Sequence, residues 1–262
     1  MPLARADLES LLRARQLDRT LTTALPPIDP RDDAALAPSG IASLDARLGG
    51  GFPRGQLSEI VGPRSSGRTS LQLQLVAAAT ARGELVGLVD ALDGLDVESA
   101  AAAGVDLARL LWIRGHVVSN PGLCGDLNQR ALEQAIRALA LVLQAGNFGL
   151  VVFDAAEAPP DALRRLPFTT WLRLQRMVEG SPTLCVLIGN EAMARSSAGL
   201  TVQLGEGRRG PAGKSGRSER PGGSGPKFGP RLFRGLDVDV RIARARSRKQ
   251  DDVRVSLSTA AV

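Results

Sequence analysis

Eight consecutive residues, Gly62 to Thr69, have the types and the spacing of a phosphate-binding loop. They follow the pattern G-x-x-x-x-G-K-[ST], except that Arg68 stands in the lysine position. Backbone N–H groups of such a loop, together with the N-terminus of the following helix, bind phosphate, and the Thr69 hydroxyl would bind Mg²⁺. The loop and its helix therefore predict a nucleotide site, formed by Gly62, Ser65, Ser66, Gly67, Arg68, Thr69 and Ser70.

The arginine at position 68 is the main departure from the pattern. Lysine brings a compact charge to the β- and γ-phosphates, whereas arginine is larger, planar and more delocalised, so the exchange is not conservative at a tight site. ATP and Mg²⁺ would then bind weakly or no longer bind. The alternative is a tight turn between a strand and a helix that binds no ligand.

The segments around the loop predict alternating strands and helices. An apolar strand at 57–61 precedes the loop, and a helix at 70–82 follows it. Further strands are expected at 85–89, 110–113, 149–153 and 183–188, and helices at 43–48, 96–103, 126–145 and 161–179, the last broken near Pro167. This order favours an α/β fold with a mostly parallel central sheet flanked by helices.

Polar residues follow several of these strands. They are Asp90, Asp154 and the pair Asn190 and Glu191. Functional groups of a parallel sheet collect at the carboxyl ends of its strands, so these side chains are expected near the loop. Asp154, after the run LVVF, is the candidate for a second nucleotide-binding carboxylate that holds Mg²⁺ through water. An aspartate after a strand is also a common turn residue.

The two ends of the chain differ from this pattern. Residues 1–21 predict a basic N-terminal helix, and residues 22–39, with four prolines, predict a linker. The helix would dock either on its own domain or on a neighbouring molecule. Residues 40–262 are expected to form one core domain, whose strands at 200–204, 235–246 and 253–257 have no helices between them and suggest an antiparallel extension of the sheet.

A basic segment, residues 205–231, separates the first two of these strands. It is rich in Gly, Ser and Pro and contains seven basic and two acidic residues, which predicts a flexible loop. Such a loop either contacts the phosphate backbone of DNA or is a solvated insertion. The candidate DNA-binding residues of this loop and of the following strand are Arg208, Arg209, Lys214, Arg217, Arg241, Arg244 and Arg246.

The composition bears on the partners, the metal sites and the location that we expect. The formal charge is +6 and the pI is about 10.5, which permits a polyanionic partner. Cys124 and Cys185 lie far apart without metal-ligand neighbours, and His116 is the only histidine, so a histidine-rich metal site is excluded. No apolar run reaches transmembrane length and no signal-peptide core is present, so we expect a cytoplasmic protein without a membrane partner.

Residues 40–258 resemble the core of the RecA recombinase family. The resemblance is most specific in SGIASLDARLGGGFPRGQLSEIVGPRSSGRTSL and in LVGLVDALDGLD. It implies that Asp154 is the Mg²⁺ aspartate and that Asp96 lies near the adenine. It also implies that the catalytic glutamate of the family is replaced by Leu92, and the aromatic residue that stacks on the base by Ser99.

Further family positions are altered near the triphosphate. The Asn-Gln pair that senses the γ-phosphate corresponds to Asn190 and Glu191, and a carboxylate there would repel the ligand. Arg244 and Arg246 fall where the family has lysines that reach the phosphates of a neighbouring subunit. Within the family, this pattern is most similar to the ImuA-type accessory proteins of translesion DNA synthesis.

The resemblance therefore implies a non-catalytic scaffold of the SOS response and error-prone translesion synthesis. Its expected partners are DNA, a RecA-fold neighbour (a second copy or RecA itself), a Y-family-like polymerase homologue and an error-prone polymerase. One alternative is an ATP-dependent recombinase of the RecA family. Another is a small-molecule kinase or a nucleotide-regulated switch on the same frame.

Overall fold

The computed structural model describes residues 35–115, 125–205, 208–209, 236–245 and 252–257. The predicted N-terminal helix, most of the predicted linker and most of the predicted basic loop lie outside these residues. The same holds for Lys214, Arg217, Arg246, Cys124 and His116.

Strands and helices alternate along the described chain, as the sequence predicts. The strands of the central sheet up to residue 204 are β3 (Leu57–Val61), β4 (Val86–Asp90), β5 (Leu110–Arg114), β6 (Leu150–Asp154), β7 (Leu184–Gly189) and β8 (Ala198–Leu204). The helices are α2 (Ala42–Leu48), α3 (Arg68–Ala81), α4 (Val97–Ala102), α5 (Gly125–Ala145), α6 (Pro160–Arg164) and α7 (Phe168–Val178), with short 3-10 helices η2 (Leu107–Arg109) and η3 (Arg195–Ser197). No helix among the described residues combines the length and the apolar character that a bilayer crossing needs.

The central sheet has the strand order β11-β10-β8-β3-β7-β6-β4-β5. All neighbours from β8 to β5 are parallel. At the other edge, β10 (Leu236–Ala245) is antiparallel to β8, and both β11 (Asp252–Leu257) and β9 (Arg208–Arg209) are antiparallel to β10. The predicted α/β fold, with a mostly parallel sheet and an antiparallel C-terminal extension, is confirmed.

The direction of β8 differs from the prediction. The sequence suggested that 200–204 belongs to the antiparallel extension, but β8 runs parallel to β3, from Leu57 opposite Ala198 to Val61 opposite Gln203. The prediction was wrong because the short connection after β7 contains no α-helix and resembles a simple turn. In the structure this connection carries the chain back across the sheet, so the extension begins only with β10.

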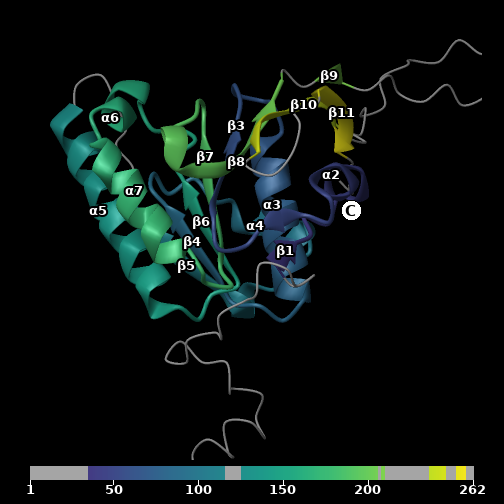
Figure 1. Cartoon of the computed structure of the whole chain (residues 1–262), viewed down its shortest axis with the longest axis horizontal. Coiled ribbons are helices and arrows are strands. Elements are labelled where there is room, and N and C mark those ends of the chain that lie inside the picture. The colour runs from purple at the N-terminus through teal and green to yellow at the C-terminus, as the bar shows by residue number, and fades with distance from the viewer. Residues whose placement is uncertain (1–34, 116–124, 206–207, 210–235, 246–251, 258–262) are drawn as a thin grey trace, which may run out of the picture.

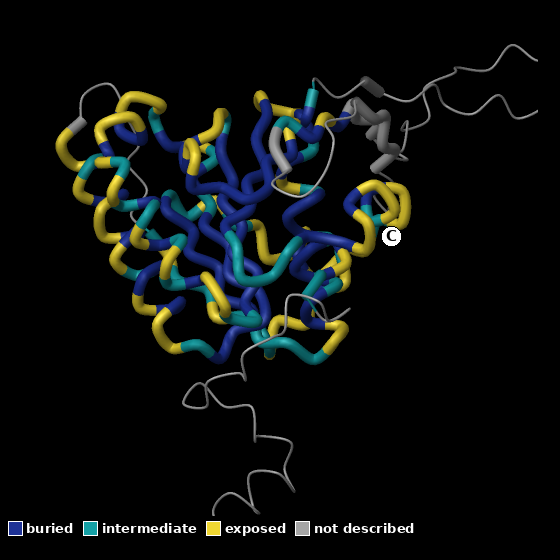
Figure 2. The backbone as a smooth tube through the Cα atoms, viewed as in Figure 1, coloured by how far each residue is buried: buried dark blue, intermediate teal, exposed yellow. Residues whose placement is uncertain are grey.

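Helices cover both faces of the sheet and form a three-layer arrangement (Figure 1). Helices α2, α3 and α4 lie on one face, and α5, α6 and α7 lie on the other. Successive residues of a strand belong to opposite apolar clusters: Leu88 of β4 packs with Leu71 and Leu75 of α3, whereas Val89 packs with Leu132 and Leu139 of α5. Burial on both sides explains why β4, β6 and β7 are largely apolar, and they form part of the dark centre of Figure 2.

Part of the segment that the sequence assigns to the linker pairs with the core. Strand β1 (Leu36–Ala37) pairs antiparallel with β2 (Phe52–Pro53), and Ala37 is buried. A Cβ atom at Gly51 would lie 2.2 Å from the carbonyl oxygen of Ala37, so only glycine permits this approach. Similarly, β9 lies inside the span predicted as the basic loop.

Candidate nucleotide site

The phosphate-loop segment connects the central strand β3 to α3. Gly67 has φ +89° and caps the helix, and Ser65 has φ +61°, so the backbone is left-handed at both positions. A Cβ atom at Gly62 would lie 2.7 Å from the carbonyl oxygen of Leu204 and 2.7 Å from Ser66 Oγ. The loop is thus packed against the end of β8, and its helix begins at Arg68, two residues before the predicted start.

The polar groups of the loop suit a phosphate. Thr69 is exposed at the start of α3, where the first N–H groups of a helix lack partners within it. The Ser66 hydroxyl is buried and makes no hydrogen bond with the described residues. Because this oxygen is covered by the loop itself, the groups that a phosphate can reach are the first N–H groups of α3 and the Thr69 hydroxyl. The loop therefore fits a phosphate group.

Arg68, in the lysine position, is held by the chain itself. The residue is 5% exposed, and its Nη1 donates a 3.5 Å hydrogen bond to the carbonyl oxygen of Ala156. Its Nη2 lies 4.0 Å from Glu157 Oε1. Burial lowers the pKa of Arg68, and the charges of Glu157 and Asp154 oppose this effect. The guanidinium therefore contacts the segment after β6.

Arg64 of the loop contacts the same carboxylate. Its Nε donates a 3.0 Å hydrogen bond to Glu157 Oε2, and its Nη2 donates to the same oxygen. This pairing raises the pKa of Arg64, which is otherwise largely exposed. Arg64 and Arg68 of the loop thus both contact Glu157. No sequence motif indicates a role for this residue.

Asp154 lies beside the loop, as the sequence suggests. It ends β6, directly opposite Asp90 at the end of β4. Its Oδ1 accepts a 2.9 Å hydrogen bond from the N–H of Ala156, and its carboxylate is also hydrogen-bonded to Gln72 of α3. Burial is the main cause that raises its pKa. Among the described residues no group of three or more His, Cys, Asp or Glu could hold a metal, so Mg²⁺ would depend on ligand oxygens together with Thr69 and Asp154.

Asp90 stabilises a loop through hydrogen bonds within the chain. It is 3% exposed and accepts 2.9 Å hydrogen bonds from the N–H groups of Gly94 and Leu95. The indole N–H of Trp112 donates a third bond of 3.2 Å. The carboxylate thereby fixes the segment that contains Leu92.

Leu92 and Asp96 belong to this segment. Leu92 is partly buried and packs against the apolar cluster that includes α5, so it offers nothing that could orient water. Asp96 caps α4: its side chain accepts hydrogen bonds from the N–H groups of Glu98 and Ser99 and from the Ser99 hydroxyl. These bonds, with that of the Ser99 hydroxyl first, lower the pKa of Asp96. Contact of Asp96 with an adenine stays a prediction.

The connection after β7 is held by a buried carboxylate that the sequence analysis missed. Glu59 of β3 is 0% exposed. Its Oε1 accepts hydrogen bonds of 2.8 and 2.7 Å from the N–H groups of Met193 and Ala194, and its Oε2 accepts one of 2.9 Å from Thr201. The sequence could have pointed to this role, because Glu59 is a charged residue inside a predicted apolar strand. Glu191, in the same connection, forms a 2.8 Å ion pair with Arg164.

The candidate DNA-binding residues are only partly placed. Arg241 is exposed on β10. Arg208 and Arg209 form β9, which pairs with the start of β10, and Arg244 lies near the end of β10, opposite Thr201 of β8. These positions therefore share the antiparallel extension, which is separated from β3 by β8 alone.

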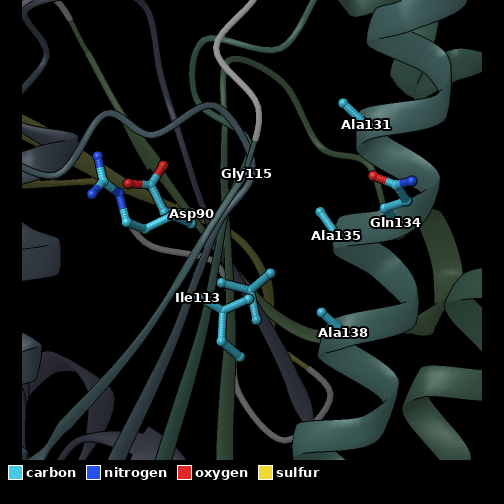
Figure 3. Close-up of a pocket in the computed structure, with 9 residues that line it drawn as sticks. Asp90, Ile113, Gly115, Ala131, Gln134, Ala135 and Ala138 are labelled. Carbon is cyan, nitrogen blue, oxygen red and sulfur yellow. The ribbon is translucent and has the colours of Figure 1, made fainter.

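A cavity of about 160 Å³ lies at the opposite edge of the sheet, between α5 and the strands β4 and β5. Figure 3 shows Ala131, Gln134, Ala135 and Ala138 of α5 directed toward these strands, where Ile113 faces them. Strand β5 is the last in the order of the described sheet. The cavity thus adjoins a strand whose outer edge pairs with no other described strand.

The sequence of this site has relatives among known proteins. The RecA N-terminal domain model matches residues 28–162. Protein RecA of Clavibacter michiganensis subsp. michiganensis is 40% identical over 131 residues, which cover 50% of this chain and 32% of that protein. Protein RecA of Acholeplasma laidlawii is 38% identical over 122 residues, covering 46% and 33% of the two chains. The aligned part therefore represents about a third of the length of these relatives.

Proposed function

The chain belongs to the RecA family, and from this premise we propose that it is a non-catalytic accessory protein of the DNA damage response. It acts in the cytoplasm, in error-prone translesion synthesis during the SOS response, as the ImuA-type proteins do that its altered site resembles. In this role it contacts DNA, a RecA-fold neighbour and polymerase partners, namely a Y-family-like homologue and an error-prone polymerase.

The observation that carries this proposal is the environment of Leu92. This residue stands where the family resemblance expects the catalytic glutamate, and it packs against an apolar cluster. A leucine can neither accept a proton nor orient water, and loss of such a group slows hydrolysis by orders of magnitude. Arg68 contacts Ala156 and Glu157, and this further lowers the expected rate of hydrolysis.

Two features support contact with partners. The outer edge of β5 is unpaired within the described sheet, and exposed strand edges readily add a strand from another molecule. The cavity beside it, lined by both apolar and polar residues, and exposed Leu111 on β5 extend this surface. We assign it to a RecA-fold neighbour, either a second copy or RecA. The charge of +6 favours DNA as a second partner.

The alternative function is an ATP-dependent recombinase of the RecA family. The geometry of the loop favours it, because the left-handed backbone at Ser65 and Gly67 and the N-terminus of α3 are suited to a phosphate. Nucleotide binding without turnover is compatible with both functions, so hydrolysis distinguishes them.

The experiment is a steady-state ATPase measurement with and without single-stranded DNA, with a RecA protein as positive control. We expect turnover at the background level, unchanged by DNA and equal in Thr69→Ala, because neither Leu92 nor the engaged Arg68 supports the reaction. Turnover close to that of the RecA control, lost in Thr69→Ala, would establish the recombinase alternative instead.

A further inference from the structure

The carboxylate of Glu157 lies where the two arginines of the phosphate loop converge. Arg64 donates two hydrogen bonds to it, and Arg68 Nη2 is 4.0 Å from its other oxygen. We propose that Glu157 acts as an internal competitor for phosphate, so that a phosphate-bearing ligand binds the loop only by displacing this side chain. The inference rests on the proposed function in one respect, namely that the loop still binds phosphate.

Charge balance explains why the carboxylate occupies this position. Arg68 is buried, and a buried cation is strongly destabilising unless an anion compensates it. The anionic groups near it are Glu157 and Asp154. The hydrogen-bonding capacity of Asp154 is already shared with Ala156 and Gln72. Glu157 is therefore the carboxylate that serves both arginines, as the oxygens of a phosphate would.

The surroundings of Glu157 allow its side chain to leave. Its side chain is 48% exposed, whereas its neighbours Ala155 and Ala158 are buried at 0% and 3%. Ala155 donates its N–H to the carbonyl oxygen of Ile188, and Ala158 donates to that of Ala155. The backbone on both sides is thus anchored, and rotation of the side chain alone frees Arg64 and Arg68.

The need to displace Glu157 should lower the affinity of the loop for a phosphate-bearing ligand. A ligand that must first replace an ion pair binds more weakly than one that meets free arginines. Ion pairs with an exposed member are weak, so removing the competitor should raise affinity about fivefold rather than by orders of magnitude. Glu157→Gln keeps the size of the side chain and removes its charge.

The test is a calorimetric titration of the full chain with inorganic pyrophosphate at low ionic strength. Asp161→Asn is the matched control, because Asp161 follows closely in the chain and pairs with Arg164 instead of the loop. We expect about fivefold tighter binding in Glu157→Gln and in Glu157→Ala, and less than a twofold change in Asp161→Asn. A single cooperative unfolding transition well above the assay temperature would establish that both Glu157 variants are folded.

Three results would overturn the inference. Equal affinity of the wild type and the Glu157 variants would leave the loop as a phosphate site without internal competition. Equal gains in Glu157→Gln and Asp161→Asn would reduce the effect to net charge. Absence of binding in every variant at millimolar pyrophosphate would show that the loop is no phosphate site, and the accessory role would then stand or fall on the ATPase measurement alone.

Discussion

Individual residues of the candidate site form structural contacts within the chain. Arg68 contacts Ala156 and Glu157, and Leu92 extends an apolar cluster. Asp96 caps a helix. Each side chain thus has a structural partner within the chain, which is a sufficient reason for it to be there without catalysis.

The ionisation of Asp154 leads to a prediction about the stability of the protein. Burial raises its pKa, with Asp90 adding to the effect and Ala156, Gln72 and Arg68 opposing it. An acid whose pKa is higher in the folded state is unfavourable when ionised: the destabilisation is present above the folded pKa and disappears below the unfolded value of about 4. We predict that Asp154→Asn raises the free energy of unfolding at pH 7, because the amide removes a charge that burial disfavours.

The difference in the free energy of unfolding between Asp154→Asn and the wild type should shrink as the pH is lowered, because the wild-type carboxyl then becomes neutral as well. Urea unfolding at several pH values between 7 and 4 measures it. Asp161→Asn, at a carboxylate whose side chain is 84% exposed, serves as the control and should show little change. Destabilisation by Asp154→Asn of equal size at every pH would contradict the prediction.

At the scale of elements, β3 is the strand on which the site depends. It lies between β7 and β8, and the phosphate loop begins at its carboxyl end. Glu59 in its middle binds the connection after β7 and the Thr201 hydroxyl of β8. One buried carboxylate thereby links the loop strand to both neighbours and to the segment that contains Asn190 and Glu191.

We predict that Glu59→Ala is strongly destabilising. It leaves the N–H groups of Met193 and Ala194 and the Thr201 hydroxyl without an acceptor in the interior, and each unpaired buried group costs about 1–3 kcal/mol. The expected loss is at least about 3 kcal/mol in urea unfolding. Glu59→Gln retains an acceptor for the two N–H groups, so it should lose less than half as much. A Glu59→Ala protein as stable as the wild type would show that water replaces the carboxylate.

At the scale of the molecule, the two edges of the sheet differ in chemistry. One edge ends in β5 with the cavity and the exposed Leu111 beside it, and the other carries the antiparallel strands with the basic positions Arg208, Arg209, Arg241 and Arg244. We expect the first edge to meet protein and the second to meet DNA. Phosphate contact by basic residues is independent of sequence and weakens steeply with salt.

We predict weak DNA binding without sequence preference, to which the basic loop contributes. Changing Arg208, Arg209, Lys214 and Arg217 together to Ala should flatten the dependence of log K on log salt by up to about one unit for each phosphate that the variant no longer binds. Fluorescence anisotropy with single-stranded DNA at several salt concentrations measures this slope. Stacking should add little, since Phe228 and Phe233 are the aromatic residues nearby.

The control variant removes the same number of positive charges from a different part of the protein. Arg130 and Arg137 of α5 and Arg173 and Arg176 of α7 are exposed on the face opposite to α3. Their joint change to Ala should leave the slope close to that of the wild type. If both quadruple variants behave alike, the loop is a solvated insertion and net charge alone attracts DNA.

Much of the fold was determined locally by the sequence. The apolar runs of β3, β4, β6 and β7 and the cap residues Gly67 and Asp96 specify strands and helix starts through neighbouring residues only. The loop between Gly62 and Thr69 was predictable for the same reason, since its geometry follows from glycine positions and from the helix after it.

The tertiary structure alone decided which distant side chains meet at the site. Arg64 and Glu157 are 93 positions apart, and Glu59 and Met193 are 134 apart. Their contacts follow from the order and the direction of strands, including the parallel course of β8. Hydrophobic periodicity specifies which face of a strand is buried and leaves open which strand lies beside it, so neither pairing could be derived before the sheet was known.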